Sequence, residues 1–199
     1  ERVYLAHQQN CVALDLRTGI PQQHFSIPET QTQAENTWGY VSYQDDRLYG
    51  SSQRASASVI GQNRPRIMAF SYGDNRPIGV SESVFCRDRH TGEFRWTYGD
   101  GQRLIINPSI TLSQGAMVFL ESTQPAALSA AQARIPATAL LPQGHAFLVN
   151  LNPATGIVRW RKSVALPFQH AVYLQIAKEQ GLIIATGARD LKGKVHYDI

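Results

Sequence analysis

Three segments of this 199-residue chain share one pattern, and this repetition constrains the fold more than any other feature. Each segment begins with an apolar stretch and continues with Asp or Asn, two variable residues and Thr-Gly. Two of the three also carry Trp at the fourth position after the glycine. The segments are CVALDLRTGIPQQ (11–23), VFCRDRHTGEFRW (84–96) and LVNLNPATGIVRW (148–160). Such self-similarity indicates that one structural unit is used several times along the chain.

A β-hairpin with a short loop explains the residues that the segments share. An Asp or Asn side chain can accept hydrogen bonds from the backbone N–H groups of the loop, and a threonine hydroxyl does so more weakly. Glycine supplies the positive φ that a loop with a bulge requires. The returning strand then places an aromatic ring on one face of the sheet. The residues predicted to form these loops and to dock the hairpins are Asp15, Thr18, Gly19, Asp88, Thr91, Gly92, Trp96, Asn152, Thr155, Gly156 and Trp160.

Further strand pairs surround the copies of this pattern. The segments 38–52, 106–122 and 171–187 each read as a strand, a short polar turn and a second strand that ends in small residues. A full unit then has four antiparallel strands, which is the makeup of a β-propeller blade. Amphipathic helix patterns are not evident elsewhere, and this disfavours α/β folds. The sequence predicts an all-β fold that holds about three to four blades of a seven- or eight-bladed β-propeller.

The whole chain, residues 1–199, is expected to be part of one β-propeller domain. It divides into a partial blade (1–29), a blade over 37–99, a blade over 104–165 and a second partial blade (170–199). An open arc leaves apolar blade faces and strand edges exposed. We therefore expect an excerpt of a longer polypeptide, or a chain that pairs with complementary chains to close the ring. The expected partners are the remaining blades, with a protein or a small ligand in addition.

Two insertions enlarge the central blades between the second and third strands. They cover residues 53–82 and 123–145. The second insertion is rich in alanine, and residues 126–134 predict a helical turn. Insertions at one edge of a repeat commonly gather on one face, and that face is often the binding face.

The pattern A-x-D-x-x-T-G-x-x-x-W resembles the tryptophan-docking repeat of the pyrroloquinoline-quinone (PQQ)-type β-propellers. This family includes quinoprotein alcohol dehydrogenases and non-enzymatic relatives such as the outer-membrane assembly lipoprotein. The resemblance covers the whole chain and implies that Trp96 and Trp160 pack between neighbouring blades and lock them together. The copies depart from this pattern at three positions. In the first copy Gln23 replaces the tryptophan, and Cys86 and Asn150 replace the alanine of the second and third copies.

The name of the repeat does not entail the cofactor. Quinone-binding members of the family carry an adjacent cysteine pair, a tryptophan beneath the quinone and a Glu/Asn/Asp set around calcium. The cysteines of this chain, Cys11 and Cys86, are far apart in sequence, and no Asp-rich calcium loop is present. Asp45 and Asp46 read as a solvated hairpin tip. We therefore predict no cofactor for this chain.

Three functions remain open at this point. The first is a non-catalytic propeller module that acts as a scaffold for a protein or a ligand, in an exported, periplasmic protein as the resemblance implies. The alternative is a fragment of a PQQ-dependent alcohol or sugar dehydrogenase, which would need PQQ and calcium. The third is a propeller that binds glycans or peptides at the insertion face.

Trp38, Asn107 and His170 lie where the innermost strands of three blades begin. They are candidates for the mouth of a central channel, where a small molecule or a peptide could bind. The other interpretation is that these residues close the hub, with Trp38 as a packing residue. The six histidines form no metal-binding motif, so no metal site is predicted.

Charge and hydropathy argue against two classes of partner. The formal net charge is +4, and the arginines concentrated within residues 54–76 fit a solvated loop better than a nucleic-acid patch. No apolar run approaches the ~20 residues of a membrane helix. We expect no nucleic-acid partner and no membrane span. Cys11 and Cys86 lie in apolar strands, where a buried free thiol is the usual outcome and a disulfide needs an oxidising compartment.

Overall fold

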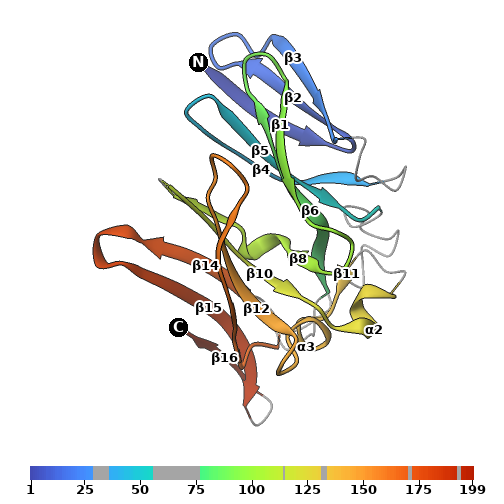
Figure 1. Cartoon of the computed structure of the whole chain (residues 1–199), viewed down its shortest axis with the longest axis vertical. Coiled ribbons are helices and arrows are strands. Elements are labelled where there is room, and N and C mark those ends of the chain that lie inside the picture. Colours follow the sequence, from blue (N-terminus) through green and yellow to red (C-terminus); the bar gives the residue numbers. More distant parts are fainter. Residues whose placement is uncertain (29–35, 56–76, 114, 131–133, 170–171, 192–193) are drawn as a thin grey trace.

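The chain forms an all-β structure of antiparallel sheets, as the sequence predicts (Figure 1). None of the sheets closes on itself within the part of the chain that is described. The computed structural model describes residues 1–28, 36–55, 77–113, 115–130, 134–169, 172–191 and 194–199.

The strands group into four antiparallel units that follow one another along the chain. Unit 1 and unit 4 are three-stranded sheets, with the strand orders β1-β2-β3 and β14-β15-β16. The strands of unit 1 are β1 (Arg2–His7), β2 (Asn10–Asp15) and β3 (Pro21–Ser26). The strands of unit 4 are β14 (Val172–Ala177), β15 (Leu182–Leu191) and β16 (Lys194–Asp198), and the short 3-10 helix η3 (Lys178–Gln180) joins the first two.

Units 2 and 3 each contain four strands in antiparallel order. Unit 2 consists of β4 (Thr37–Gln44), β5 (Arg47–Gln53), β6 (Ile78–Asp88) and β7 (Phe94–Tyr98). Unit 3 consists of β9 (Thr111–Ser113), β10 (Ala116–Ser122), β12 (Ala146–Leu151) and β13 (Val158–Ser163). Strand β8 (Leu104–Ile106) pairs with both β6 and β10, and this joins the two units into one larger sheet.

The hydrophobic core consists of clusters that lie between successive units. The first cluster packs Ala13 and Phe25 of unit 1 against Trp38 and Phe85 of unit 2. A second cluster lies between units 2 and 3 and includes Tyr49, Trp96, Phe119 and Val149. A third cluster joins units 2, 3 and 4 through Val80, Leu120, Val172 and neighbouring aliphatic residues. The apolar side chains that point out of the sheets therefore hold neighbouring units together.

The first insertion is shorter than the sequence indicates, because the strands around it are longer, whereas the second spans 123–145 between β10 and β12 as predicted. Strand β5 ends at Gln53 and β6 begins at Ile78, so residues 78–82 belong to a strand. Ser81 is fully buried in this part of β6, although the composition of the segment resembles that of a loop. Residues 56–76 of the first insertion lie outside the described residues.

The second insertion folds onto the core. It contains α2 (Pro125–Leu128), β11 (Arg134–Ile135), which pairs with β6, and α3 (Ala137–Leu140). The helical turn expected in 126–134 is present as α2, whereas β11 and α3 were not predicted. The side chains of Ala127, Ala137 and Leu140 are buried in the third cluster. In the described ranges, no helix has the length and apolar character to cross a membrane.

Candidate docking site between repeat units

The three repeated turns share one hydrogen-bond geometry. In the turn of unit 2, the Asp88 carboxylate accepts hydrogen bonds from the backbone N–H groups of His90 (2.8 Å) and Thr91 (2.9 Å). In unit 1 the Asp15 carboxylate accepts the two equivalent bonds, and in unit 3 the Asn152 side-chain oxygen accepts the first of them, from Ala154. These bonds confirm that the Asp or Asn caps the loop. They also hold the pKa of Asp88 and of Asp15 below the usual range, because a carboxylate that accepts N–H bonds is stabilised in its charged form.

The threonine and glycine of each turn have the predicted roles. The three threonine hydroxyls accept the backbone N–H of the residue that follows the glycine, at 3.2–3.4 Å. Each glycine has a positive φ of 69–82° that other residues rarely adopt. The bonds run from Ile20 to Thr18, from Glu93 to Thr91 and from Ile157 to Thr155, and the glycines are Gly19, Gly92 and Gly156.

Trp96 of unit 2 docks on the turn of unit 3. Its side chain is 7% exposed, and its indole Nε1–H donates a hydrogen bond to the Pro153 carbonyl at 3.1 Å. The ring lies on Gly156, where an added Cβ would meet the ring carbons Cδ2 and Cε3 at 2.7 Å. Glycine is therefore needed at this position for close approach as well as for its φ. The predicted docking role of Trp96 agrees with this geometry.

Tyr49 is a second docking residue, which the repeat pattern did not reveal. Its hydroxyl donates to the same Pro153 carbonyl at 3.2 Å, and its ring centroid lies 6.0 Å from that of Trp96. Burial raises the pKa of the Tyr49 hydroxyl, which therefore remains a donor. The signal for Tyr49 was weak because it lies on β5, far in sequence from the turn that it contacts.

Unit 1 docks on unit 2 through a polar version of the same contact. Gln23 occupies the position of Trp96, and its Nε2 lies 3.3 Å from where a Cβ on Gly92 would stand. Arg2 donates to the Gln23 side-chain oxygen at 3.2 Å and to the Arg89 carbonyl at 2.9 Å. Arg89 stands at the turn position of Pro153, one residue after the capping Asp or Asn. The departure of the first copy from the tryptophan pattern therefore keeps the docking site and changes its donor.

Trp160 differs from Trp96 in its surroundings. Its ring is half-buried, and the Lys162 ammonium lies 6.0 Å from the ring centroid. Among the described residues, no repeated turn covers Trp160. Its docking role therefore remains a prediction.

A buried ion network also crosses from unit 2 to unit 3. Glu121 on β10 is fully buried and accepts a hydrogen bond from the Tyr98 hydroxyl at 2.7 Å. Arg161 on β13 pairs with the same carboxylate. Burial and the neighbouring Glu121 raise the pKa of Tyr98. This network satisfies a charge that would otherwise be costly inside the interface.

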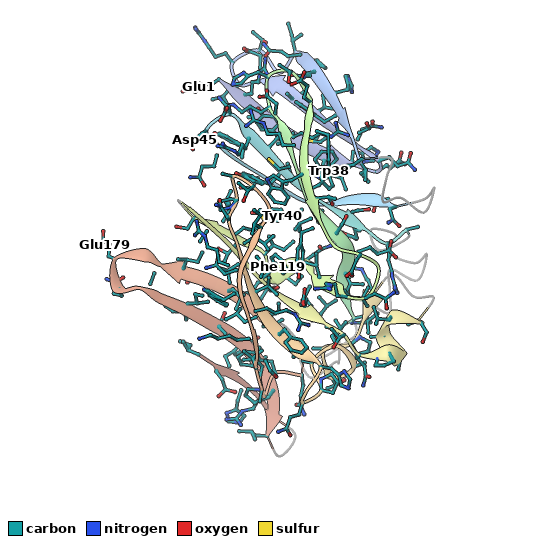
Figure 2. The ribbon with its side chains drawn as sticks, in the orientation of Figure 1. Glu1, Trp38, Tyr40, Asp45, Phe119 and Glu179 are labelled. Atoms are coloured by element: carbon teal, nitrogen blue, oxygen red, sulfur yellow. The ribbon has the colours of Figure 1, made fainter. Side chains whose placement is uncertain are left out.

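Of the three candidate channel residues, the structure describes the surroundings of Trp38 and Asn107. Trp38 packs inside the first core cluster (Figure 2). Its ring centroid lies 4.9 Å from that of Phe85. Asn107 lies in the short 3-10 helix η2 (Asn107–Ser109). The surroundings of Trp38 are therefore those of a packing residue, as in the interpretation in which these residues close the hub. His170 lies outside the described residues.

Asn107 is the centre of a polar cluster at the ends of β5 and β6. Its side-chain oxygen accepts hydrogen bonds from the hydroxyls of Ser51 (3.1 Å) and Ser81 (2.7 Å). Its side-chain nitrogen donates to Gln53 at 2.9 Å. Both polar groups of the Asn107 side chain therefore bond to residues of unit 2. The cluster connects unit 2 to the segment that begins unit 3.

The two insertions meet at one end of the sheets. Arg54, which follows β5, donates to the carbonyl oxygens of Ala130 (2.7 Å) and Leu128 (2.8 Å) and pairs with Glu82 at 3.3 Å. Strand β11 of the second insertion pairs with the start of β6, where the first insertion ends. The described parts of the two insertions therefore gather on one side, as expected.

Groups that could perform chemistry are scarce in the described ranges. There is no group of three or more His, Cys, Asp or Glu side chains placed to hold a metal ion in this part of the chain. Cys11 and Cys86 are free and buried, and burial raises the pKa of each thiol to about 12. Such thiols are protonated at neutral pH and are weak nucleophiles.

Comparison of the chain with protein-family models and with curated proteins finds no match. The resemblance to the PQQ-type repeat therefore remains a prediction that rests on the repeat residues. What the geometry adds is the contact that these residues make between units.

Proposed function

We propose that the chain is part of a non-catalytic β-propeller of the PQQ-like, tryptophan-docking type, and that it acts as a scaffold for a protein or a ligand in an exported protein. The observation that carries this proposal is the docking contact, which occurs at two successive interfaces. The residue four positions after the glycine of one unit lies on the glycine of the next unit. The four antiparallel strands of units 2 and 3 also support the proposal, because propeller blades are four-stranded antiparallel sheets.

The insertion surface supports the scaffold role. We define this surface by the outer side of α2 and by Arg54 and β11, which tie the two insertions together. Ala126 of α2 and Ser129, which follows the helix, are exposed, whereas Ala127 between them is buried in the core. An exposed surface that packs on the core is suited to binding, because preorganisation reduces the conformational entropy lost when a partner docks.

Screening on peptide and glycan arrays tests the scaffold proposal. We expect the fluorescently labelled full chain to bind a set of arrayed peptides or glycans that the Ala126→Arg variant does not bind. The matched control is Ile157→Glu, because Ile157 is exposed on a repeat turn away from α2 and unit 2 carries Glu93 at the same turn position. Binding that is the same in all three proteins, or no binding to either array, would contradict the insertion surface as a binding face.

A titration with PQQ and calcium tests the alternative, a dehydrogenase fragment. We expect no saturable change in quinone absorbance or in tryptophan fluorescence, and no dye-linked oxidation of alcohols or sugars. Saturable binding accompanied by dye reduction would replace the scaffold proposal with the dehydrogenase.

A further inference from the structure

Gly79 is a glycine in a strand whose backbone does not require one. It lies near the start of β6 between the buried residues Ile78 and Val80, and its φ is outside the positive range. Glycine weakens a strand, and it often marks a place where a ligand or another backbone approaches closely. Among the described residues, the atom nearest to a Cβ placed on Gly79 is 3.6 Å away, so no described group makes such an approach.

Two side-chain amides border the space over Gly79. A Cβ at this position would lie 3.6 Å from Nε2 of Gln53 and 3.8 Å from Nδ2 of Asn107. A carboxamide nitrogen carries two hydrogens. Nδ2 of Asn107 uses one of them in its bond to the Gln53 oxygen. Gln53 is only 8% exposed, and its Nε2 has no hydrogen-bond partner in the described part of the chain. Both amides therefore have donors left beside Gly79, and we call these three residues the amide corner.

The neighbours of the amide corner hold the two amides in place. The side-chain oxygen of Asn107 accepts hydrogen bonds from Ser51 and Ser81, so its nitrogen faces Gln53. Gly39 of β4 lies against the pair, because a Cβ there would come within 2.6 Å of both Asn107 Nδ2 and Gln53 Oε1. Donors that are positioned before a ligand arrives lose little conformational entropy on binding.

The strand pairing on both sides of β5 is irregular next to the amide corner. Between β4 and β5 the register shifts from Trp38 to Val41, and Gly39 lies in this bulge. Between β5 and β6 the register shifts from Ser52 to Gln53. Bulges re-aim side chains and are common next to active sites. The backbone therefore departs from regular pairing at the place where the two amides converge.

A cation lies on the same face of the sheet as the amide corner. Arg134 of β11 is the pairing partner of Gly79, and residues that pair directly share a face. Its Nη1 donates to the Pro77 carbonyl at 3.4 Å, which keeps the guanidinium near the start of β6. Glu82, also on β6, is paired with Arg54 at 3.3 Å. Two amide donors beside a cation suit a carboxylate, because its oxygens accept hydrogen bonds and carry negative charge.

We propose that the amide corner binds the carboxylate group of a small organic acid. One carboxylate oxygen lies over Gly79 and accepts hydrogen bonds from Gln53 and Asn107, and Arg134 attracts the negative charge. Gly79 determines whether the site is open, because any side chain at this position would take the place of the oxygen. The inference goes beyond the scaffold proposal, since it needs neither a closed ring nor the outer side of α2.

Titration with sodium acetate, followed by NMR of the side-chain amide groups, tests the site. At neutral pH and constant ionic strength we expect saturable shifts of the Gln53 and Asn107 amide signals. The dissociation constant should lie in the millimolar range, because so small a ligand makes few contacts. Acetamide has the shape of acetate without its charge, and it should bind more weakly.

Gly79→Ala is the decisive variant. Its methyl group would lie 3.6–3.8 Å from the two amides, so the fold should persist with an unchanged or higher urea midpoint. The same methyl group blocks the oxygen and should weaken acetate binding by at least ~10-fold. Arg134→Gln should weaken acetate binding about 2–5-fold and leave acetamide binding unchanged. Ile157→Glu, on an exposed turn, is the matched control and should bind acetate as the unaltered chain does.

Two sets of results would overturn the inference. Acetate shifts that do not saturate in the unaltered chain contradict the site, as does saturable binding that Gly79→Ala leaves unchanged. Acetamide binding as tight as that of acetate, or no effect of Arg134→Gln, contradicts the assignment to a carboxylate. Neither result bears on the scaffold proposal, because Gly79→Ala should still bind the arrayed ligands that Ala126→Arg does not bind.

Discussion

At the scale of single residues, a backbone carbonyl receives the side chains that hold one unit on the next. Trp96 and Tyr49 converge on the Pro153 carbonyl, and Arg2 donates to the carbonyl of Arg89 at the same turn position. The glycine three residues further on lets the docking side chain approach closely. The contact therefore depends on the backbone of the receiving turn and on the donor of the docking strand.

Trp96→Ala should lower the free energy of unfolding by about 3–5 kcal/mol, because it removes a buried ring and leaves a cavity between units. Trp160→Ala should cost about 1 kcal/mol, since that ring is half-buried and touches no repeated turn among the described residues. Urea denaturation followed by circular dichroism measures both values. Equal losses for the two variants would show that Trp96 does not dock as described.

Gly156→Ala should be more destabilising than Gly19→Ala. Both substitutions place alanine at a positive φ, which costs roughly 1–2 kcal/mol. Only at Gly156 does the added methyl group also meet the Trp96 ring, and such overpacking adds roughly 1–3 kcal/mol. The difference in urea midpoint between the two variants measures the second effect. If Gly19→Ala proves as costly as Gly156→Ala, the ring does not lie on Gly156.

The stability gained from Asp88 should be lost at low pH. The pKa of Asp88 is lowered by the Thr91 N–H, then by Arg95 and then by the His90 N–H, so its charged form is favoured in the folded chain. Its contribution is full above the unfolded pKa of about 3.9 and falls as the pH drops toward the folded value. Asp88→Asn keeps the cap, as Asn152 does in unit 3, and loses the charge. The stability gap between the two proteins should narrow from about pH 5 downward, and a constant gap would contradict this origin.

At the scale of elements, one arginine joins the two insertions. Arg54→Ala leaves the Leu128 and Ala130 carbonyls at the end of α2 without their donor, and we expect a loss of roughly 1–3 kcal/mol. Hydrogen exchange should accelerate in α2 and remain unchanged in the turn of unit 1. The control is Arg17→Ala, which removes an exposed arginine. Exchange in α2 that matches the unaltered chain would show that Arg54 does not hold this helix.

The sequence predicts the structural features that depend on residues close together along the chain. The Asp or Asn cap, the threonine bond and the positive φ of glycine all lie within a few residues, so the turns were foreseen correctly. Tyr49 and Arg2 were missed because their partners lie on other units. The start of β6 is assigned to the insertion on sequence, because a serine-rich segment resembles a loop, and the acceptor of the Ser81 hydroxyl, Asn107, lies far along the chain.

At the scale of the whole molecule, the core is divided among the interfaces between units. In the described part of the chain, each cluster is shared by residues of at least two units. Stability in such an arrangement is approximately a sum of unit terms and nearest-neighbour terms. Disruption of one interface should therefore destabilise the two units that form it more than the others. Hydrogen exchange measured for each segment can follow this local loss of stability.

The carbonyl that receives each docking side chain has a consequence for how such repeats change over time. A main-chain oxygen is present whichever amino acid stands there, and this chain has Leu16, Arg89 and Pro153 at that position. The donor is also exchangeable, as an indole in one interface and a guanidinium in another. Mutations can therefore accumulate on both sides of the contact while the geometry persists. Lineages of this repeat can lose recognisable sequence identity long before they lose their architecture.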